Sequence, residues 1–335
     1  MKGVTTFENS MRSRRIFLLA LSSTAIIPSW VLAQQKPMLR IGWLSADKAE
    51  NSPFFDAFRG GMRELGYIEG RNLLIEARFA EGSSEALDRF AVELVGLKPQ
   101  VIVAQGGPAT HPIQRTGATV PVVFGYSGDP VAGKVVASLA RPGGNFTGIT
   151  LLSLDLVGKR MGLLKEMLPG LKRVAIVANP GHPGEPDELR ASQAAAKSLG
   201  LIVDYHQMRS ESELDSALEA ILKARDEAVD VFPDAFTLRY SEKIAAFAIK
   251  NRVPTISGWA RFAEAGNLMS YGPNLRDVYR RLALYVDKIV KGARPGELPV
   301  ELPTSVELVI NLKAAKSLGT AIPQTMLMRA SRVIE

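Results

Sequence analysis

The sequence predicts an α/β fold of two similar lobes, each built around a parallel sheet and joined by a hinge of several strands. A chain of 335 residues that is 46% hydrophobic can bury two sizeable cores. From Met38 onward, short β-branched runs alternate with longer segments of helical periodicity, which is typical of βαβ units. Because this alternation occurs twice in the same order, we expect two lobes of similar architecture.

The first set of elements lies between residues 40 and 124. Its first helix should end where Gly66 follows Leu65, and its second should begin after Gly82 and Ser83. The predicted strands are Arg40–Leu44, Leu73–Arg78, Val101–Ala104 and Val120–Phe124, and the predicted helices are Phe54–Leu65 and Ser84–Leu97.

The second set lies between residues 174 and 257. A helix should end before Gly200, and the run Ser210-Glu211-Ser212-Glu213 is a capping box that begins the next one. The predicted strands are Val174–Ala178, Ile202–His206, Val229–Phe232 and Pro254–Ser257, and the predicted helices are Glu188–Leu199, Glu211–Arg225 and Tyr240–Lys250.

Segments rich in glycine and proline mark where the chain crosses between the lobes. We expect crossings at residues 141–150 and 265–274, a helix over Leu275–Lys291 that returns to the first lobe, and a last crossing near Pro299–Ser305. The first lobe would then comprise residues 38–148 and 270–303, and the second residues 149–269 and 304–335. Such lobes close around a ligand by bending at the hinge.

The N-terminus, residues 1–33, reads as a signal peptide. Three arginines, Arg12, Arg14 and Arg15, precede an apolar run that is too short to span a bilayer, and cleavage is expected near Ala33. The paired arginines resemble a twin-arginine signal, although an ordinary Sec leader fits as well, and Met11 is an alternative start. Either export route predicts a periplasmic protein.

Composition argues against several kinds of function. The net charge of +7 belongs partly to the leader, and no basic block interleaved with aromatic residues follows it, so we expect no nucleic-acid partner. The chain has no cysteine, no clustered metal ligands, and no glycine-rich nucleotide-binding motif. We therefore expect no metal site and no cofactor.

The stretch "VVFGYSGDPVAG", residues 122–133, raises the question of a catalytic serine. A nucleophile elbow needs glycine on both sides of Ser127, but position 129 is aspartate. The three histidines, His111, His182 and His206, are scattered along the chain. The sequence therefore predicts no catalytic residue, and a periplasmic hydrolase or lyase that uses Ser127 is kept as an alternative.

The same stretch can instead hold a ligand. Asp129 and Pro130 suit the N-cap and first position of a helix over Val131–Leu139, which leaves Tyr126 and Ser127 to face a cleft.

Other candidate ligand contacts follow the predicted strands, because ligands of open α/β folds bind at the carboxyl ends of strands. The run Gln105 to Thr110 should begin a helix at Pro108 and offer backbone N–H groups to a carboxylate, although a plain tight turn is an alternative. Asp234 could accept a ligand ammonium or cap the next helix. Three aromatic residues at strand ends, Trp43, Trp259 and Tyr271, could form apolar walls or pack in the core.

Several stretches resemble one family. Residues 265–319, together with "FRGGMRELGYIEGRNLLIEARFAEG", "GDPVAGKVVASLARPGGNFTGIT" and "RVAIVANP", are similar to the ABC_sub_bind family of substrate-binding proteins of ABC importers. The resemblance implies a type I periplasmic-binding-protein fold of two Rossmann-like lobes, with a small solute caught between them. It also implies delivery of that solute to an ABC permease in the inner membrane. Some relatives are similar to binders of aromatic amino acids.

The resemblance also implies a set of ligand-binding positions. They are Trp43, Ser45, Gln105, Gly106, Gly107, Thr110, Tyr126, Ser127, Asn179, Pro180, Asp234 and Tyr271.

We expect a monomeric receptor for an amino acid or related carboxylate. The carboxylate would meet Ser127 and the N–H groups near Gly107, and the amine would meet Asp234. A sensor that serves a signalling partner is a further alternative.

Overall fold

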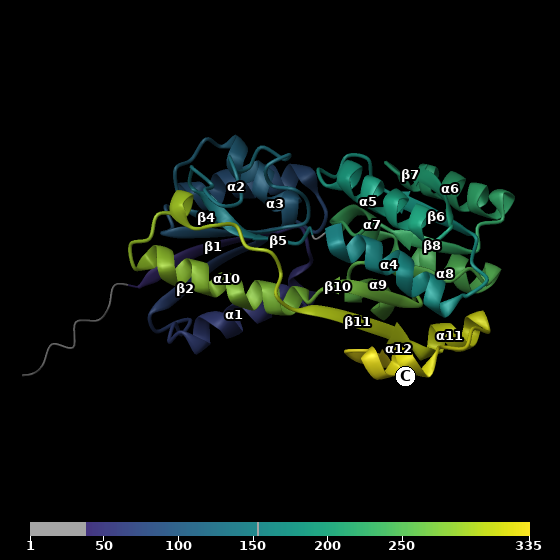
Figure 1. Cartoon of the computed structure of the whole chain (residues 1–335). Helices are drawn as coiled ribbons and strands as arrows, with labels where there is room; N and C mark the ends of the chain where they lie inside the picture. The colour runs from purple at the N-terminus through teal and green to yellow at the C-terminus, as the bar shows by residue number, and fades with distance from the viewer. Residues whose placement is uncertain (1–37, 153) are drawn as a thin grey trace, which may run out of the picture. The chain divides into compact units, whose positions relative to one another are not determined.

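The computed structural model describes residues 38–152 and 154–335 (Figure 1). The expected signal peptide, residues 1–33, lies outside the described residues.

The first sheet is parallel throughout, in the order β2-β1-β3-β4-β5. Its central strands are buried and largely apolar, as expected for a sheet covered by helices on both faces. Its strands are β1 (Leu39–Ser45), β2 (Leu73–Phe79), β3 (Val101–Gln105), β4 (Val122–Tyr126) and β5 (Phe146–Thr150). The helices of this part are η1 (Ala49–Asn51), α1 (Pro53–Glu64), α2 (Ser84–Gly96), α3 (Gly106–Arg115), α10 (Leu275–Val290) and η2 (Pro295–Glu297).

The second sheet has the order β12-β11-β10-β9-β8-β6-β7, and only its β10–β11 pair is antiparallel. Its strands are β6 (Arg173–Ala178), β7 (Ile202–Gln207), β8 (Ala228–Val231), β9 (Thr255–Ser257), β10 (Met269–Pro273), β11 (Val306–Asn311) and β12 (Arg332–Ile334). Its helices are α4 (Leu154–Met167), α5 (Glu185–Ser198), α6 (Glu211–Ala224), α7 (Ala235–Arg239), α8 (Ser241–Asn251), α9 (Ala260–Glu264), α11 (Leu312–Leu318) and α12 (Gln324–Arg329).

The two-lobed α/β fold is confirmed, and the predicted strands all form with small shifts at their ends. The sheets do not divide quite where the expected lobe boundaries fall, since β5 continues to Thr150 in the first sheet and β10 continues to Pro273 in the second. The antiparallel pairing of β10 with β11 departs from the expected all-parallel sheets, because the chain re-enters the second sheet along β11 after its excursion through α10.

The predicted helix over Val131–Leu139 is wrong, because this segment forms only turns. Lys134 adopts a left-handed backbone with φ of 56°, which ends any helix begun at Pro130. A Cβ at Gly133 would also lie 2.4 Å from the Tyr126 hydroxyl, so the turn packs closely on that ring. Asp129 still acts locally, since its Oδ1 accepts the N–H groups of Val131 and Ala132.

The chain passes between the sheets three times: after β5, after β10 and before β11. The last of these segments is tied to the first sheet, because Thr150 donates its backbone N–H to the carbonyl of Glu301 and Glu301 donates to the carbonyl of Gly148. Helix α10 lies beside α1 (Figure 1). A Cβ at Gly61 of α1 would sit 2.3 Å from the Arg280 carbonyl oxygen, so glycine lets these helices approach.

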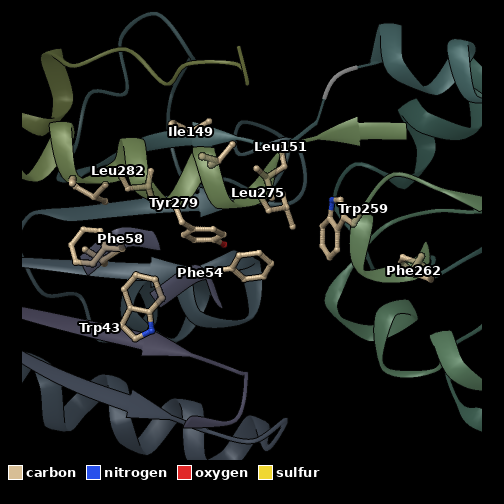
Figure 2. Packing of buried hydrophobic residues seen from close by; sticks show 14 of the residues in the cluster. Trp43, Phe54, Phe58, Ile149, Leu151, Trp259, Phe262, Leu275, Tyr279 and Leu282 are labelled. Atoms are coloured by element: carbon tan, nitrogen blue, oxygen red, sulfur yellow. The ribbon is translucent and has the colours of Figure 1, made fainter. Parts of the chain in front are cut away.

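An aromatic cluster fills the core beside α1 and α10. Trp43 packs against Phe55, Phe58 and Tyr279, with ring centroids 5.0, 5.4 and 6.0 Å apart. Figure 2 shows Trp43, Phe58 and Tyr279 with Phe54, and Trp259 and Phe262 join the same buried cluster from the α9 side. The cluster therefore connects residues associated with both sheets. Among residues 38–152 and 154–335, no helix has the length and apolar character needed to cross a membrane.

Candidate ligand-binding site

The loops after β1 and β3 form one polar network. Ser45 is fully buried, and its Oγ accepts the Asp47 backbone N–H at 2.9 Å. Gln105 donates from Nε2 to Asp47 Oδ2 at 2.6 Å. The oxygen of the same side-chain amide, Gln105 Oε1, is buried without a hydrogen-bond partner among the described residues. The structure thus brings Ser45 and Gln105 together through Asp47, which the sequence reasoning missed.

Trp43 lies in the core below this network. Its side chain is fully buried, and its indole Nε1 has no hydrogen-bond partner within the described part of the chain. Because a buried N–H without a partner is costly, this donor is a candidate contact for a bound molecule. Phe55 packs on Trp43 and meets Phe79 edge-on at 5.6 Å, so partly buried aromatic rings adjoin the same strand end.

Helix α3 begins directly after Gln105. It starts at Gly106, with φ of 77°, and not at Pro108 as predicted. Gln105 is its N-cap but makes no side-chain cap, because its amide is bonded to Asp47. An uncapped helix N-terminus carries partial positive charge and attracts anions. Thr110 is buried and donates to the Gly106 carbonyl, so its hydroxyl is already used within the helix.

Tyr126 and Ser127 have different surroundings. Tyr126 is fully buried, and its hydroxyl lies 2.8 Å from His111 Nε2 on α3. Burial, with the nearby charge of Asp129, raises the pKa of Tyr126 to about 12. Ser127 is 8% exposed, and its Oγ lies 3.3 Å from Nε2 of His182. Tyr126 therefore packs towards α3, whereas Ser127 points to the segment that follows β6.

His182 is the partner of Ser127 that the sequence did not reveal. Burial lowers the pKa of His182, and the charges of Asp234 and Glu185 oppose that shift only in part. The backbones are close here as well, since a Cβ at Gly128 would lie 3.3 Å from the Gly184 nitrogen. The two segments follow strands of different sheets, so their contact is one that only the folded chain creates.

Asn179 and Asp234 meet beside this contact. Asn179 donates from Nδ2 to Asp234 Oδ2 at 2.8 Å, and Asp234 Oδ1 accepts the Thr237 backbone N–H at 2.5 Å. Thr237 Oγ1 accepts the Asp234 N–H in return, which completes a capping box at α7. Asp234 therefore has the helix-capping role that the sequence allowed. Asn179 and Pro180 also line a cavity of about 440 Å³ with Arg209 and Phe236.

Tyr271 does not lie with these residues. It lines a separate hollow with residues of α4 and β11, so the structure does not bring it to the loops after β1, β3 and β4.

Polar contacts join the loops of the two sheets. Arg239 donates from Nη2 to the Gly82 carbonyl at 3.3 Å, and Arg261 Nη1 lies 3.8 Å from Asp47 Oδ2. Together with the pair of Ser127 and His182, these contacts link the two lobes.

A buried charged group lies against the second sheet. Arg160 of α4 contacts Asp230 of β8, with Nε 3.2 Å from Oδ1, and both side chains are almost fully buried. Glu188 of α5 is also buried, and the lack of solvent raises its pKa to about 8 against the opposing charge of Arg160. These buried charges were not predicted from the sequence. Within the described residues, no cluster of His, Asp and Glu side chains could hold a metal ion.

Comparisons with known proteins agree with this architecture. The family described as ABC transporter substrate binding protein matches residues 52–334. The tyrosine-binding protein of Clostridioides difficile is 23% identical over 275 residues, which cover 82% of this chain and 77% of that protein. A conserved domain protein from Vibrio cholerae has a TM-score of 0.80 at 28% identity, with 88% of this chain and 99% of that chain covered. An ABC domain from Streptococcus pneumoniae in complex with L-Trp has a TM-score of 0.81 at 22% identity, with 89% and 100% covered.

Proposed function

The chain belongs to the ABC transporter substrate-binding protein family, and we propose that it captures an amino acid with an aromatic side chain between its two lobes. The lobes would close on the solute by hinge bending, and the closed form would deliver it to an ABC permease. The expected signal peptide would place this receptor in the periplasm. Capture and release require no catalytic step.

The observation that carries this proposal is the pairing of opposite binding groups around Gln105. Its buried Oε1 and the carboxylate of Asp47 are acceptors, which suit an ammonium group. The next residue, Gly106, begins a helix whose N-cap residue makes no side-chain cap, so the backbone N–H groups of its first turn suit a carboxylate. An α-amino acid carries an ammonium and a carboxylate on the same carbon atom. The adjacent residues Gln105 and Gly106 could therefore bind these two groups at the same time.

We place the ammonium on Asp47 and Gln105 and not on Asp234, where the sequence had suggested it. Both carboxylate oxygens of Asp234 already accept hydrogen bonds, from Thr237 and Asn179. Ser127, directly after β4, stays in the proposal as a hydrogen-bond donor to the carboxylate.

Aromatic residues support the choice of side chain. Phe55 and Phe79 adjoin β1 and β2, and Phe236 meets Tyr240 edge-on at 5.3 Å near the cavity beside Asn179. Partly buried rings of this kind favour a flat apolar group through offset or edge-to-face contacts. The relatives named for tyrosine and bound to tryptophan bind ligands of this class.

Isothermal titration calorimetry of residues 34–335 tests the proposal. We expect L-tryptophan, L-tyrosine or L-phenylalanine to bind, and the N-acetyl and methyl ester derivatives to bind at least about tenfold more weakly because each removes one charge. Asp47→Asn should weaken binding more than Asp234→Asn does. Absence of binding by every amino acid, or equal binding of the blocked derivatives, would reject the proposal.

A second candidate is a hydrolase, and the 3.3 Å separation of Ser127 Oγ and His182 Nε2 favours it. A serine nucleophile also needs its histidine to be oriented by a third group, and within the described residues no carboxylate forms a hydrogen bond with His182. Hydrolysis of simple esters by the protein, lost in Ser127→Ala and in His182→Ala, would favour this function over binding alone.

A further inference from the structure

A hollow of about 660 Å³ lies on the second sheet, lined by α4, β10, β11 and the chain around the end of α12. Its apolar lining comes from Leu163, Tyr271, Val306 and Leu308. Val306 is 38% exposed, so part of this lining is open to solvent. None of Ser45, Gln105, Ser127 or Asp234 lines it, which makes it distinct from the proposed amino-acid site.

The rim of the hollow carries an excess of positive charge. Arg329 is balanced by Glu166, with Nη2 2.5 Å from Oε2. Lys159, two turns before Glu166 on α4, forms no ion pair within residues 38–152 and 154–335. An apolar surface beside an unbalanced cation suits a molecule that has an apolar body and a negative charge.

Gly162 keeps the hollow open. A Cβ at this position would meet no atom within 4 Å, although Gly162 lies inside α4, where glycine is less favourable than alanine. The neighbouring face of α4 packs on the sheet through Met161 and Leu164, which are fully buried. A larger side chain at position 162 would therefore enter the hollow without displacing the core.

We propose that this hollow binds an amphipathic organic anion, a carboxylate or sulfonate with an apolar body of one or two rings. The apolar body would cover Tyr271 and Leu308, and the anionic group would lie beside Lys159. A hollow of about 660 Å³ is large enough for an organic anion with one or two rings. The site rests on its own residues, and L-tryptophan enters the experiments below only to occupy the amino-acid site of the proposed function.

The first experiment compares two fluorescent probes that share one ring system. Anilinonaphthalene sulfonate carries a negative charge, and N-phenylnaphthylamine is the same molecule without the sulfonate. With saturating L-tryptophan present, we expect the sulfonate to bind at one saturable site and the neutral probe to bind at least about tenfold more weakly. Equal affinity for the two probes would overturn the proposed preference for an anion.

Two pairs of variants locate the site. Lys159→Glu should weaken sulfonate binding about tenfold, whereas Lys313→Glu, which changes an exposed lysine on α11, should not. Gly162→Phe should abolish the saturable signal, whereas Gly60→Phe, a helical glycine of α1 with equally open surroundings, should preserve it. Unchanged binding in Gly162→Phe, or equal loss in both glycine variants, would overturn the proposal. Titration of each variant with L-tryptophan shows whether the amino-acid site is intact, so that a loss of probe binding can be assigned to the hollow.

Discussion

The two lobes differ in what they bury. Among the described residues, every buried Asp, Glu or Arg side chain lies between residues 151 and 274, in the segment of the second sheet: Arg160, Glu185, Glu188, Asp226, Asp230 and Asp234. The first sheet is surrounded by aromatic and aliphatic side chains and buries only uncharged polar groups such as Ser45 and Thr110. The interior of the first lobe is thus apolar with a few uncharged polar groups, whereas the interior of the second contains buried charges.

Because of this difference, we expect the stability of the two lobes to be sensitive to different kinds of substitution. A close-packed apolar core is sensitive to added or removed volume. A buried ion pair is sensitive to the loss of either partner, because the remaining charge is left without compensation. Each lobe should therefore respond strongly to a change that the other would tolerate.

The largest effect is expected from Arg160→Met. Methionine is an unbranched apolar side chain of similar length. The substitution removes the guanidinium that lies 3.2 Å from Asp230, so the fully buried carboxylate loses its partner. We expect the free energy of unfolding to fall by about 3–5 kcal/mol, as for other broken buried pairs. Urea denaturation followed by circular dichroism would measure the loss.

The double variant Arg160→Met/Asp230→Asn is the control. Removal of the second charge should restore a large part of the lost stability, because the penalty comes from the isolated carboxylate. If the double variant is no more stable than the single one, packing and not charge governs this region, and the contrast between the lobes fails.

In the first lobe, Gly61→Ala tests sensitivity to volume. The added methyl group would lie 2.3 Å from the Arg280 carbonyl oxygen of α10, so α1 and α10 must separate, at a cost of about 1–3 kcal/mol. Gly60→Ala, one residue earlier, meets no atom within 4 Å and should stabilise α1 by up to about 1 kcal/mol. Thermal unfolding of the two variants should shift in opposite directions. Equal shifts would mean that the helices are not packed closely at Gly61.

Glu188→Gln tests the pH dependence expected of the second lobe. Burial raises the pKa of Glu188 from 4.5 to about 8, so between these values the folded state holds a proton that the unfolded state has released. This contribution to stability is fully present below pH 4.5 and is lost as the pH rises towards about 8, by up to about 1.4 kcal/mol per pH unit. Glutamine stays neutral, so the variant should gain stability relative to the parent chain as the pH rises.

Urea midpoints measured across this pH range would show the expected divergence. Glu219→Gln, at an exposed position of α6, is the matched control and should follow the parent chain throughout. A constant difference between Glu188→Gln and the parent at all pH values would show that Glu188 does not change protonation between the two states.

Periodicity and caps in the sequence were sufficient to predict most of the fold. The capping serines Ser83 and Ser210 accept the expected backbone N–H groups at the starts of α2 and α6. The failed helix over Val131–Leu139 had the same local signals in Asp129 and Pro130, but Lys134 adopts a left-handed backbone and Gly133 packs closely on the Tyr126 ring. Tertiary contacts of this kind are not encoded in a local pattern.

The candidate site was harder to predict than the fold. Gln105 and Ser127 could be placed at strand ends, but their partners Asp47 and His182 depend on which loops the two sheets bring together. Both partners lie in loops, "SADKAENSP" and "NPGHPGEP", whose composition is unusually charged or glycine-rich. The unusual composition of these two loops was therefore the sequence signal that pointed to Asp47 and His182.

The smallest effect is expected from Arg239→Ala, which removes a contact between the lobes without disturbing either core. Arg239 donates to the Gly82 carbonyl at 3.3 Å from an exposed position. A hydrogen bond of this kind contributes about 1 kcal/mol or less, so ligand affinity should fall about two- to fivefold through faster dissociation, with no change in thermal stability. Arg63→Ala, at an exposed position near the end of α1, is the control. Stopped-flow dissociation rates that are the same for the two variants would show that the contact of Arg239 with Gly82 does not hold the lobes together around the ligand.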